Sequence, residues 1–176
     1  MGIAKAVQFI CVLTIAMQLP SYAFACEAEA LVKSIASSFE HASRTNSAQA
    51  FSAAAGRYGN MHAVALFALG PYRSKLAPQD EARYVALARN FLGRILAENS
   101  TQLSGSGITI QTCSAHVVNA RFGNGTNVQF KLASSRRVTD ISVSGISLAG
   151  VLRSKFGDVL RDHNGDVRAL MDYLSQ

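Results

Sequence analysis

The sequence predicts an α+β fold, in which helices pack on one face of a curved, mainly antiparallel sheet of four or more strands. Before residue 100, apolar residues recur every three to four positions, which indicates amphipathic helices. Between residues 108 and 143, β-branched residues alternate with polar ones, as they do in half-buried strands. Helical periodicity returns after residue 147. Helices on both sides of a strand meander favour this layout, which can leave an apolar cavity between the sheet and the helices.

The N-terminus has the features of a secretory signal peptide. Lys5 supplies a positive charge, Ala6–Leu19 form an apolar run, and Pro20 closes that run. Ala23-Phe24-Ala25 then places small residues where a signal peptidase requires them, just before Cys26. The run is too short to span a bilayer. We therefore expect residues 1–25 to be removed and residues 26–176 to act in the periplasm as a single domain.

The composition of the mature chain excludes few functions. Removing residues 1–25 from the 176 leaves 151, enough for one ordinary core without metal or disulfide support. Loss of Lys5 lowers the formal net charge from +6 to +5. The basic residues are spread along the chain without interleaved aromatic residues, so nothing supports a nucleic-acid partner. Attraction to anionic lipid or to an acidic partner is compatible with this charge.

Two cysteines, Cys26 and Cys113, remain after cleavage in a compartment that permits disulfides. An even number of cysteines favours pairing, whereas the terminal position of Cys26 does not. The sequence does not give the distance between their Cα atoms, so a disulfide and two free thiols both stay open. Lipid modification of Cys26 is the less favoured alternative, because Ala-Phe-Ala lacks the aliphatic residue expected before a lipoprotein cysteine.

The helical segments are predicted from periodicity together with start and stop signals. Gly56 is expected to end the second helix, Gly70-Pro71 the third, and Pro78 to open the fourth. Asp166 is expected to cap the last helix. The expected helices cover residues 29–42, 47–55, 61–69, 78–96, 148–160 and 167–174.

Four strands are predicted between the helical segments, after a flexible Ser104–Gly107 stretch. Gly123-Asn124-Gly125 is typical of a hairpin turn, because these residues tolerate positive φ, and Ser134–Arg137 forms a second turn. Short consecutive connections imply antiparallel pairing. The expected strands cover residues 108–112, 115–122, 127–133 and 138–143.

Catalytic and metal-binding patterns are weak. His41, His62, His116 and His163 are scattered without a spacing that places two ligands on one helical face. Asp162–Asp166 resembles the start of a calcium loop but lacks the glycine and glutamate that follow in such loops, so we interpret it as a break between helices. We therefore expect no metal, no cofactor and no catalytic residues.

Two blocks of sequence resemble the MlaC family, also called the toluene-tolerance family. The C-terminal block resembles the closing signature of that family, and a second block resembles its leucine-glycine turn and the helix that follows. With the signal peptide and the order of elements, the resemblance covers most of the mature chain. The residues that carry it are Val138–Leu148, Arg153-Ser154-Lys155-Phe156 and Val159-Leu160, and then Leu69-Gly70-Pro71-Tyr72-Arg73, Pro78-Gln79, Tyr84 and Phe91.

The resemblance implies a periplasmic phospholipid carrier rather than an enzyme. Proteins of this family hold the acyl chains in an apolar cavity and shuttle lipid between the inner and outer membranes, as the soluble component of an ABC-type lipid transport system. The partners it implies are phospholipid, an inner-membrane ATP-driven transporter complex and an outer-membrane lipoprotein complex.

Apolar residues of the third to fifth helices and of the sheet are the candidates for lining the cavity, although each taken singly is more often plain core. Near the cavity mouth, Arg153 either pairs with Asp158 or Asp140, the interpretation that we favour, or orients a partner or a phosphate. The candidate lipid-binding residues are Phe67, Leu69, Tyr72, Phe91, Leu92, Ile95, Val128, Phe130, Ile141, Val143, Ile146, Leu148, Leu152 and Phe156.

Three alternatives stay open beside the phospholipid carrier. A divergent relative carries a hopanoid or another apolar molecule. A small α+β enzyme uses the cavity as an active site, with Asp140 and Tyr72 as acid and base candidates. An interaction module binds no ligand and has a filled core.

Overall fold

The computed structural model describes residues 26–103, 107–134 and 136–176. The predicted signal peptide, residues 1–25, lies outside the described residues. So do residues 104–106 of the predicted flexible stretch and Ser135 of the second predicted turn. Among the described helices, none combines the length and the hydropathy needed to cross a bilayer.

Helices occupy both ends of the described chain. In several of them a polar side chain just before the first turn accepts a hydrogen bond from a backbone N–H group: Ser47, Asn60, Ser147 and Asp166 all do so. Asp166 therefore caps the last helix, as predicted. The α-helices are α1 (Glu27–Arg44), α2 (Ala48–Tyr58), α3 (Met61–Leu69), α4 (Glu81–Glu98), α5 (Leu148–Asp162) and α6 (Val167–Ser175), and the short 3₁₀ helices are η1 (Gly70–Lys75), η2 (Pro78–Asp80) and η3 (Ser100–Gln102).

The strands form an open antiparallel sheet in the order β1-β2-β3-β4-β5, each paired with its neighbour in sequence. The first four occupy the predicted segments to within two residues at each end. The fifth is a two-residue strand that the sequence analysis did not predict. The strands are β1 (Ile108–Cys113), β2 (Val117–Phe122), β3 (Asn127–Leu132), β4 (Val138–Val143) and β5 (Ile146–Ser147).

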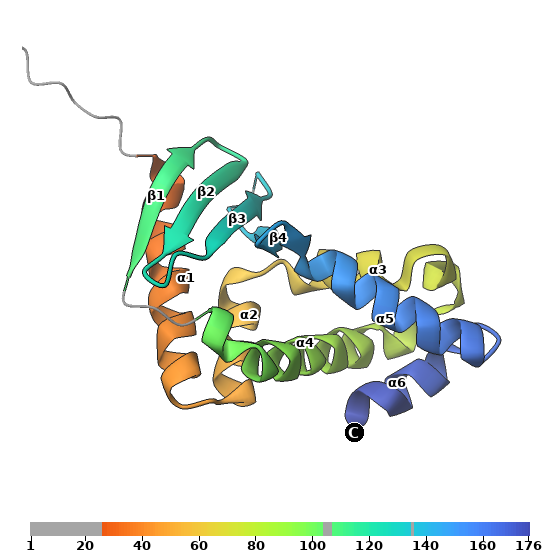
Figure 1. The fold of residues 1–176 in the computed structure, drawn as a ribbon. Coiled ribbons are helices and arrows are strands. Elements are labelled where there is room, and N and C mark those ends of the chain that lie inside the picture. Colours follow the sequence, from red (N-terminus) through yellow and green to blue (C-terminus); the bar gives the residue numbers. More distant parts are fainter. Residues whose placement is uncertain (1–25, 104–106, 135) are drawn as a thin grey trace, which may run out of the picture.

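One face of the sheet is covered by helices and the other is polar. Val118 and Phe130 are fully buried on the covered face. On the opposite face, the amide of Gln129 donates to Asn119 Oδ1 at 2.9 Å. Helix α1 packs against β1 and β2, and α3 and α5 pack against β4. Figure 1 shows the sheet at one end of the helical layer. The predicted α+β class, with helices on one face of an antiparallel sheet, is confirmed.

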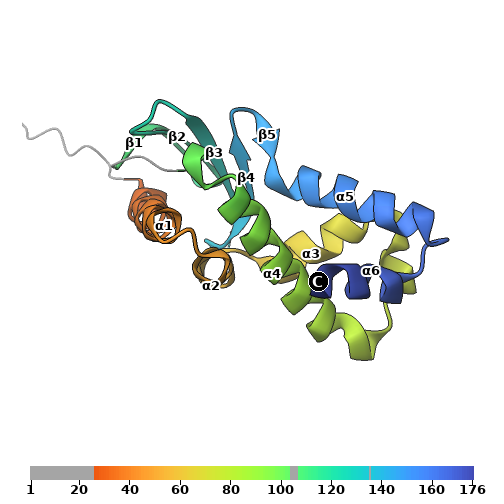
Figure 2. The same ribbon diagram turned by 60° about the horizontal axis from the view of Figure 1, so that its bottom comes forward.

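The helices associate in two groups. In one, α2 packs extensively on α4 and also on α1; in the other, α3 packs on α5, and both contact β4. Helices α4 and α5 make few direct contacts with each other, and in Figure 2 they diverge from the sheet with α3 and α6 between them. Helix α6, at the end of the molecule far from the sheet, touches both of them, and α3 touches α4. The two groups therefore meet along a seam between α4 and α5.

Cys26 and Cys113 form a disulfide, with their Cα atoms 6.0 Å apart. The sequence left a disulfide and two free thiols open, and the structure has the disulfide. The bond joins the residue before α1 to the last residue of β1, 87 positions along the chain. Because Cys26 Sγ is held in this bond, it is not available for lipid attachment.

The predicted end of the second helix at Gly56 is wrong. Helix α2 continues through Gly56 to Tyr58, and Gly59 caps it. Glycine stands at position 56 because the Arg89 side chain crosses the helix there, its Cδ 3.2 Å from the place of a β-carbon. Close approach of a neighbouring side chain explains this glycine, and chain termination does not.

Candidate functional site

An apolar cavity lies at the seam, bounded by the helices and by β4. Its volume is about 50 Å³, enough for a few water molecules but far less than an acyl chain needs. Both groups of helices contribute to its wall. The lining residues are Ile35 and Phe39 of α1, Ala54, Ala55 and Tyr58 of α2, Gly59 at the end of α2, Met61 and Val64 of α3, Leu92 and Leu96 of α4, Val138, Thr139, Asp140 and Ile141 of β4, and Leu148, Ala149 and Leu152 of α5.

The polar groups in this wall are occupied by protein partners. Asp140 accepts hydrogen bonds from the Ser147 hydroxyl at 2.8 Å and from the Ala149 N–H at 3.1 Å. The Lys131 ammonium group lies 3.7 Å from the same carboxylate. The Tyr58 hydroxyl pairs with Ser38 Oγ at 3.3 Å. These pairings leave the cavity chemically apolar, suited to hydrocarbon.

A second hollow lies beside the cavity and opens toward solvent between α4, α5 and β5. Its volume is about 310 Å³. Leu96 and Leu148 line both hollows, so these two side chains form the partition between them. Ile146, which is 61 % exposed, lies at the outer hollow, as do the charged Glu98 and Lys155. The arrangement is two apolar hollows separated by these side chains, with a polar rim on the outer one.

The structure distributes the candidate lipid-binding residues over four kinds of place. Leu92, Ile141, Leu148 and Leu152 line the inner cavity, and Ile95, Val143 and Ile146 line the outer hollow together with Leu148. Five others, buried in the core, line neither of these hollows: Leu69, Phe91, Val128, Phe130 and Phe156. Tyr72 is half-buried in η1, and Phe67 is 48 % exposed on the outside of α3.

Sequence reasoning missed the contributions of α1 and α2 to the cavity wall. The apolar stripe of α1, which includes Ile35 and Phe39, was visible from its periodicity, but a stripe does not distinguish cavity from core. No sequence pattern pointed to Ala54 and Ala55. They line the cavity because their side chains are too small to fill the space beside them. The wall of the cavity is thus formed partly by the absence of side-chain volume.

The favoured interpretation of Arg153, an ion pair with Asp158 or Asp140, is wrong. The carboxylate of Asp158 pairs with Arg161, and that of Asp140 is occupied as described above. The Arg153 guanidinium instead lies over the Phe67 ring, 4.9 Å from its centroid. It also lies beside Gly70, which has a φ of 56° and no side chain to obstruct it. This cation–π contact shields one face of an exposed aromatic ring.

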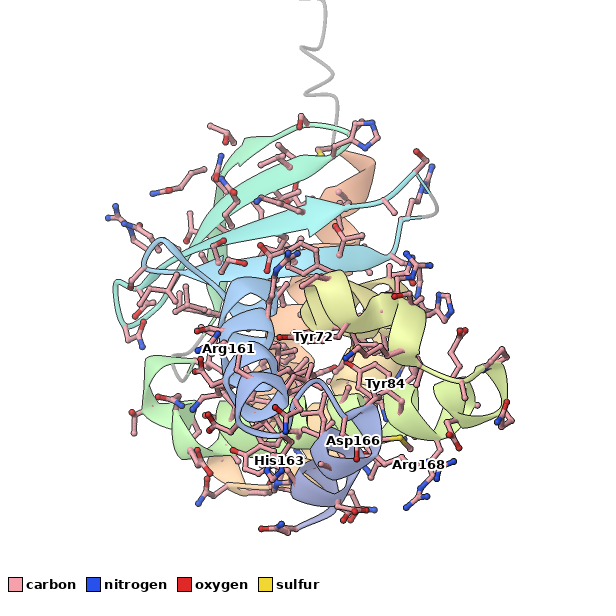
Figure 3. The ribbon with its side chains drawn as sticks, turned by 90° about the vertical axis from the view of Figure 1, so that its right-hand side faces the viewer. Tyr72, Tyr84, Arg161, His163, Asp166 and Arg168 are labelled. Atoms are coloured by element: carbon pink, nitrogen blue, oxygen red, sulfur yellow. A yellow bond between two sulfur atoms is a disulfide. The ribbon has the colours of Figure 1, made fainter. Side chains whose placement is uncertain are left out.

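Tyr72 and Asp140 are the acid and base candidates of the enzyme alternative. They lie in different places and contact different elements. Tyr72 lies beside α5, against Gly165 of the turn before α6 (Figure 3), and it does not line the cavity. Asp140 holds the start of α5. Figure 3 also shows His163 and Asp166 at that turn. Within the described part of the chain, no three metal-ligating side chains come together.

Comparisons with known proteins place the fold. The family described as MlaC protein matches residues 27–176. A solved structure of a phospholipid-binding protein from Ralstonia solanacearum, in complex with a phospholipid, superimposes with a TM-score of 0.67. It is 18 % identical, and the match covers 84 % of this chain and 94 % of that one. At this identity the likeness shows a shared fold. No curated protein sequence matches significantly.

Proposed function

Because the chain belongs to the MlaC protein family, we propose that it is a periplasmic carrier that binds the acyl chains of a phospholipid and moves lipid between the inner and outer membranes. The main observation in support is the pair of adjacent apolar hollows between α4 and α5, the inner cavity and the outer hollow. The solved relative from Ralstonia, of the same fold, is described in complex with a phospholipid.

The energetics of acyl chains explain why a carrier is needed. A diacyl lipid has on the order of thirty methylene groups, and exposing each to water costs about 0.8 kcal/mol. The total, roughly 25 kcal/mol, prevents free diffusion through an aqueous compartment. A carrier must cover the chains and still release them, so its affinity must stay below the limit of non-covalent binding.

The inner cavity, at about 50 Å³, must widen before it can hold an acyl chain. Widening can occur between α4 and α5, which have little direct contact because α4 packs on α2 and α5 packs on α3, while α6 and the contact of α3 with α4 keep the two groups joined. Rotation of Leu96 and Leu148 would join the cavity to the outer hollow. In this proposal Leu92, Ile141 and Leu152 contact the chain ends, and Ile95, Val143 and Ile146 contact the segments nearer the headgroup.

The proposal includes the cellular setting. Residues 1–25 act as a cleaved signal peptide, and residues 26–176 work as one lipid-carrier domain. The protein partners are an inner-membrane ATP-driven transporter complex and an outer-membrane lipoprotein complex. A hydrophobic cargo also explains why the polar groups of the cavity wall are fully engaged, since an unpaired polar group facing a hydrocarbon chain would cost free energy.

Native mass spectrometry of the purified protein, with extraction and identification of any bound lipid, tests the proposal. We expect a complex with the mass of one phospholipid. Ala54→Leu places a larger side chain in the inner cavity, and we expect the bound fraction to fall several-fold, with stability unchanged or raised. Ala53→Leu, at the neighbouring exposed position of α2, is the matched control and should behave like the wild type.

Each contrary result has a clear meaning. Protein that carries no lipid and takes none up from liposomes would show that the carrier proposal is wrong and would favour the interaction module. A bound hopanoid or other apolar molecule would replace the phospholipid as cargo. Equal loss of lipid in both variants would mean that the inner cavity is not where the chains bind.

A further inference from the structure

A hollow of about 560 Å³ lies between α2 and α4, lined by the residues of α2 that do not face the inner cavity. The side chains of Arg89 and Arg94 line it, with Gln49, Ser52 and Asn90, and no acidic residue does. No carboxylate in the described part of the chain lies within salt-bridge distance of either arginine. Two positive charges therefore share a concave surface without a negative one.

One hydrogen-bond donor of Arg89 is buried without a partner. The Arg89 side chain crosses α2 at Gly56, and its Nε atom is this buried donor. Buried donors in folded proteins almost always have a partner, and an unsatisfied one has a free-energy cost of desolvation. Because Nε is buried against α2, the Arg89 side chain must turn toward the hollow before a ligand can accept this hydrogen bond, and a ligand that held it there would remove the cost.

The other polar groups of the hollow are also arranged to donate. One terminal nitrogen of Arg94 donates to the Leu174 carbonyl at 2.8 Å, and its guanidinium lies 5.2 Å from the centroid of the Phe91 ring. These contacts fix Arg94 and leave other N–H groups of its five for a ligand. The Ser52 hydroxyl donates to Asn90 Oδ1 at 2.8 Å, which directs the Asn90 amide NH₂ elsewhere. Arg94 and Asn90 therefore keep N–H groups that could bind an anion.

We propose that this hollow binds an acidic segment of a partner protein, with a carboxylate held by the Arg89 guanidinium. Paired parallel hydrogen bonds between guanidinium and carboxylate are among the strongest in proteins. A concave surface fits an extended peptide better than a flat bilayer. The large exposed apolar side chains of the described chain that could insert into a membrane, Phe67, Ile146 and Tyr173, lie outside the hollow. The net charge, +6 for the whole chain and one less without Lys5, adds long-range attraction for an acidic partner.

Fluorescence anisotropy with a fluorescein-labelled octaglutamate peptide, at physiological salt, tests the proposal. We expect binding by the wild type, at least tenfold weaker binding by Arg89→Gln, and none of an octaglutamine peptide. Arg89→Lys keeps the charge but loses the planar fork, and it should also bind more weakly. Arg83→Gln removes the same charge from an exposed position of α4 outside the hollow and should bind within twofold of the wild type.

A second readout separates docking from general charge attraction. In a ¹H–¹⁵N spectrum, the Nε–H signal that disappears in Arg89→Gln should shift when the peptide is added to the wild type. Absence of binding, or equal weakening by Arg83→Gln and Arg89→Gln, would overturn the proposal. Arg89-dependent binding of phosphatidylglycerol vesicles without peptide binding would overturn it in favour of a lipid surface. Since lipid occupancy is measured separately, neither result depends on the carrier function.

Discussion

Asp140 shows how one side chain stabilises two elements. Its carboxylate accepts from Ser147 Oγ and from the Ala149 N–H, so it connects β4 to the first turn of α5. These groups include donors that a helix N-terminus would otherwise leave unsatisfied. Because Ser147 is itself the N-cap of α5, the Asp140 carboxylate also fixes the cap. We therefore assign Asp140 a structural role.

We predict that Asp140→Asn lowers the free energy of unfolding by about 1–2 kcal/mol, because the amide can accept at only one of its two atoms. Urea unfolding followed by circular dichroism measures this. Lys131→Gln, which removes only the partner whose side chain is 51 % exposed, should cost well under 1 kcal/mol. Equal effects of the two substitutions would show that the ion pair, and not the cap, stabilises the junction.

Tyr84 is the fully buried residue at which pH should affect stability. Its hydroxyl donates to the Ala65 carbonyl at 2.8 Å, joining α4 to α3. Burial raises the pKa of this hydroxyl well above its usual range, because the phenolate would lose its hydration. The folded state therefore keeps a proton that the unfolded state releases above about pH 10. Stability from this group is fully present below that pH and decreases as the pH rises beyond it.

We predict that Tyr84→Phe costs about 1 kcal/mol at pH 8, through loss of the hydrogen bond. The wild type should lose up to about 1.4 kcal/mol per pH unit above pH 10 through this residue, and the variant should not. The difference in unfolding free energy between the two proteins should therefore shrink markedly by pH 11. Urea titrations at pH 8 and pH 11 measure it, and a constant difference would contradict the assigned burial effect.

At the scale of elements, the close packing of α2 on α4 depends on Gly93. A β-carbon there would collide with the Ala48 carbonyl and would lie 2.9 Å from Ser52 Cβ. We predict that Gly93→Ala destabilises the protein by about 1–3 kcal/mol despite the better helix propensity of alanine. Gly157→Ala in α5 is the control: its nearest neighbour would be Arg161 at 3.8 Å, so stability should rise slightly. Thermal unfolding should move in opposite directions for the two variants.

The elements that the sequence predicted well are those with strong periodicity and clear caps. Helix α3 begins at Met61 and ends at Leu69 as predicted, because Asn60 caps it and Gly70-Pro71 stops it. Gly56 misled the prediction, since the reason for that glycine lies in another helix. Strand β5 was missed because two residues carry no periodicity; Ile146 and Ser147 are strand only through their pairing with β4. Local signals fix local structure, and tertiary contacts decide the remainder.

The candidate site could be predicted only in part, for a related reason. Apolar side chains such as Leu92 and Leu152 were identified from periodicity, and they do line the cavity. Phe130 and Phe156 have the same pattern and are plain core by position. Periodicity gives the buried face of an element, whereas a cavity arises where two buried faces fail to fill the space between them. Whether two buried faces leave such a space depends on both of them, so the sequence of either segment alone does not predict it.

At the scale of the whole molecule, the disulfide ties the start of α1 to the outer edge of the sheet. Strand β1 is the edge strand, and α1 packs on α2 and on β1. The bond thus anchors one helix group to the sheet at the end opposite α6. The seam between α4 and α5 is left without a covalent link, so widening of the cavity need not strain the disulfide.

We predict that the double variant Cys26→Ser/Cys113→Ser loses about 2–5 kcal/mol of unfolding free energy, because the unfolded chain is no longer closed into a loop of 87 residues. Urea unfolding of the wild type with and without dithiothreitol measures the same quantity, and the reduced wild type should match the double variant. Since the bond lies away from the seam, bound lipid should persist in the folded variant. Loss of lipid at a temperature where the variant is still folded would instead show that the anchor of α1 shapes the cavity directly.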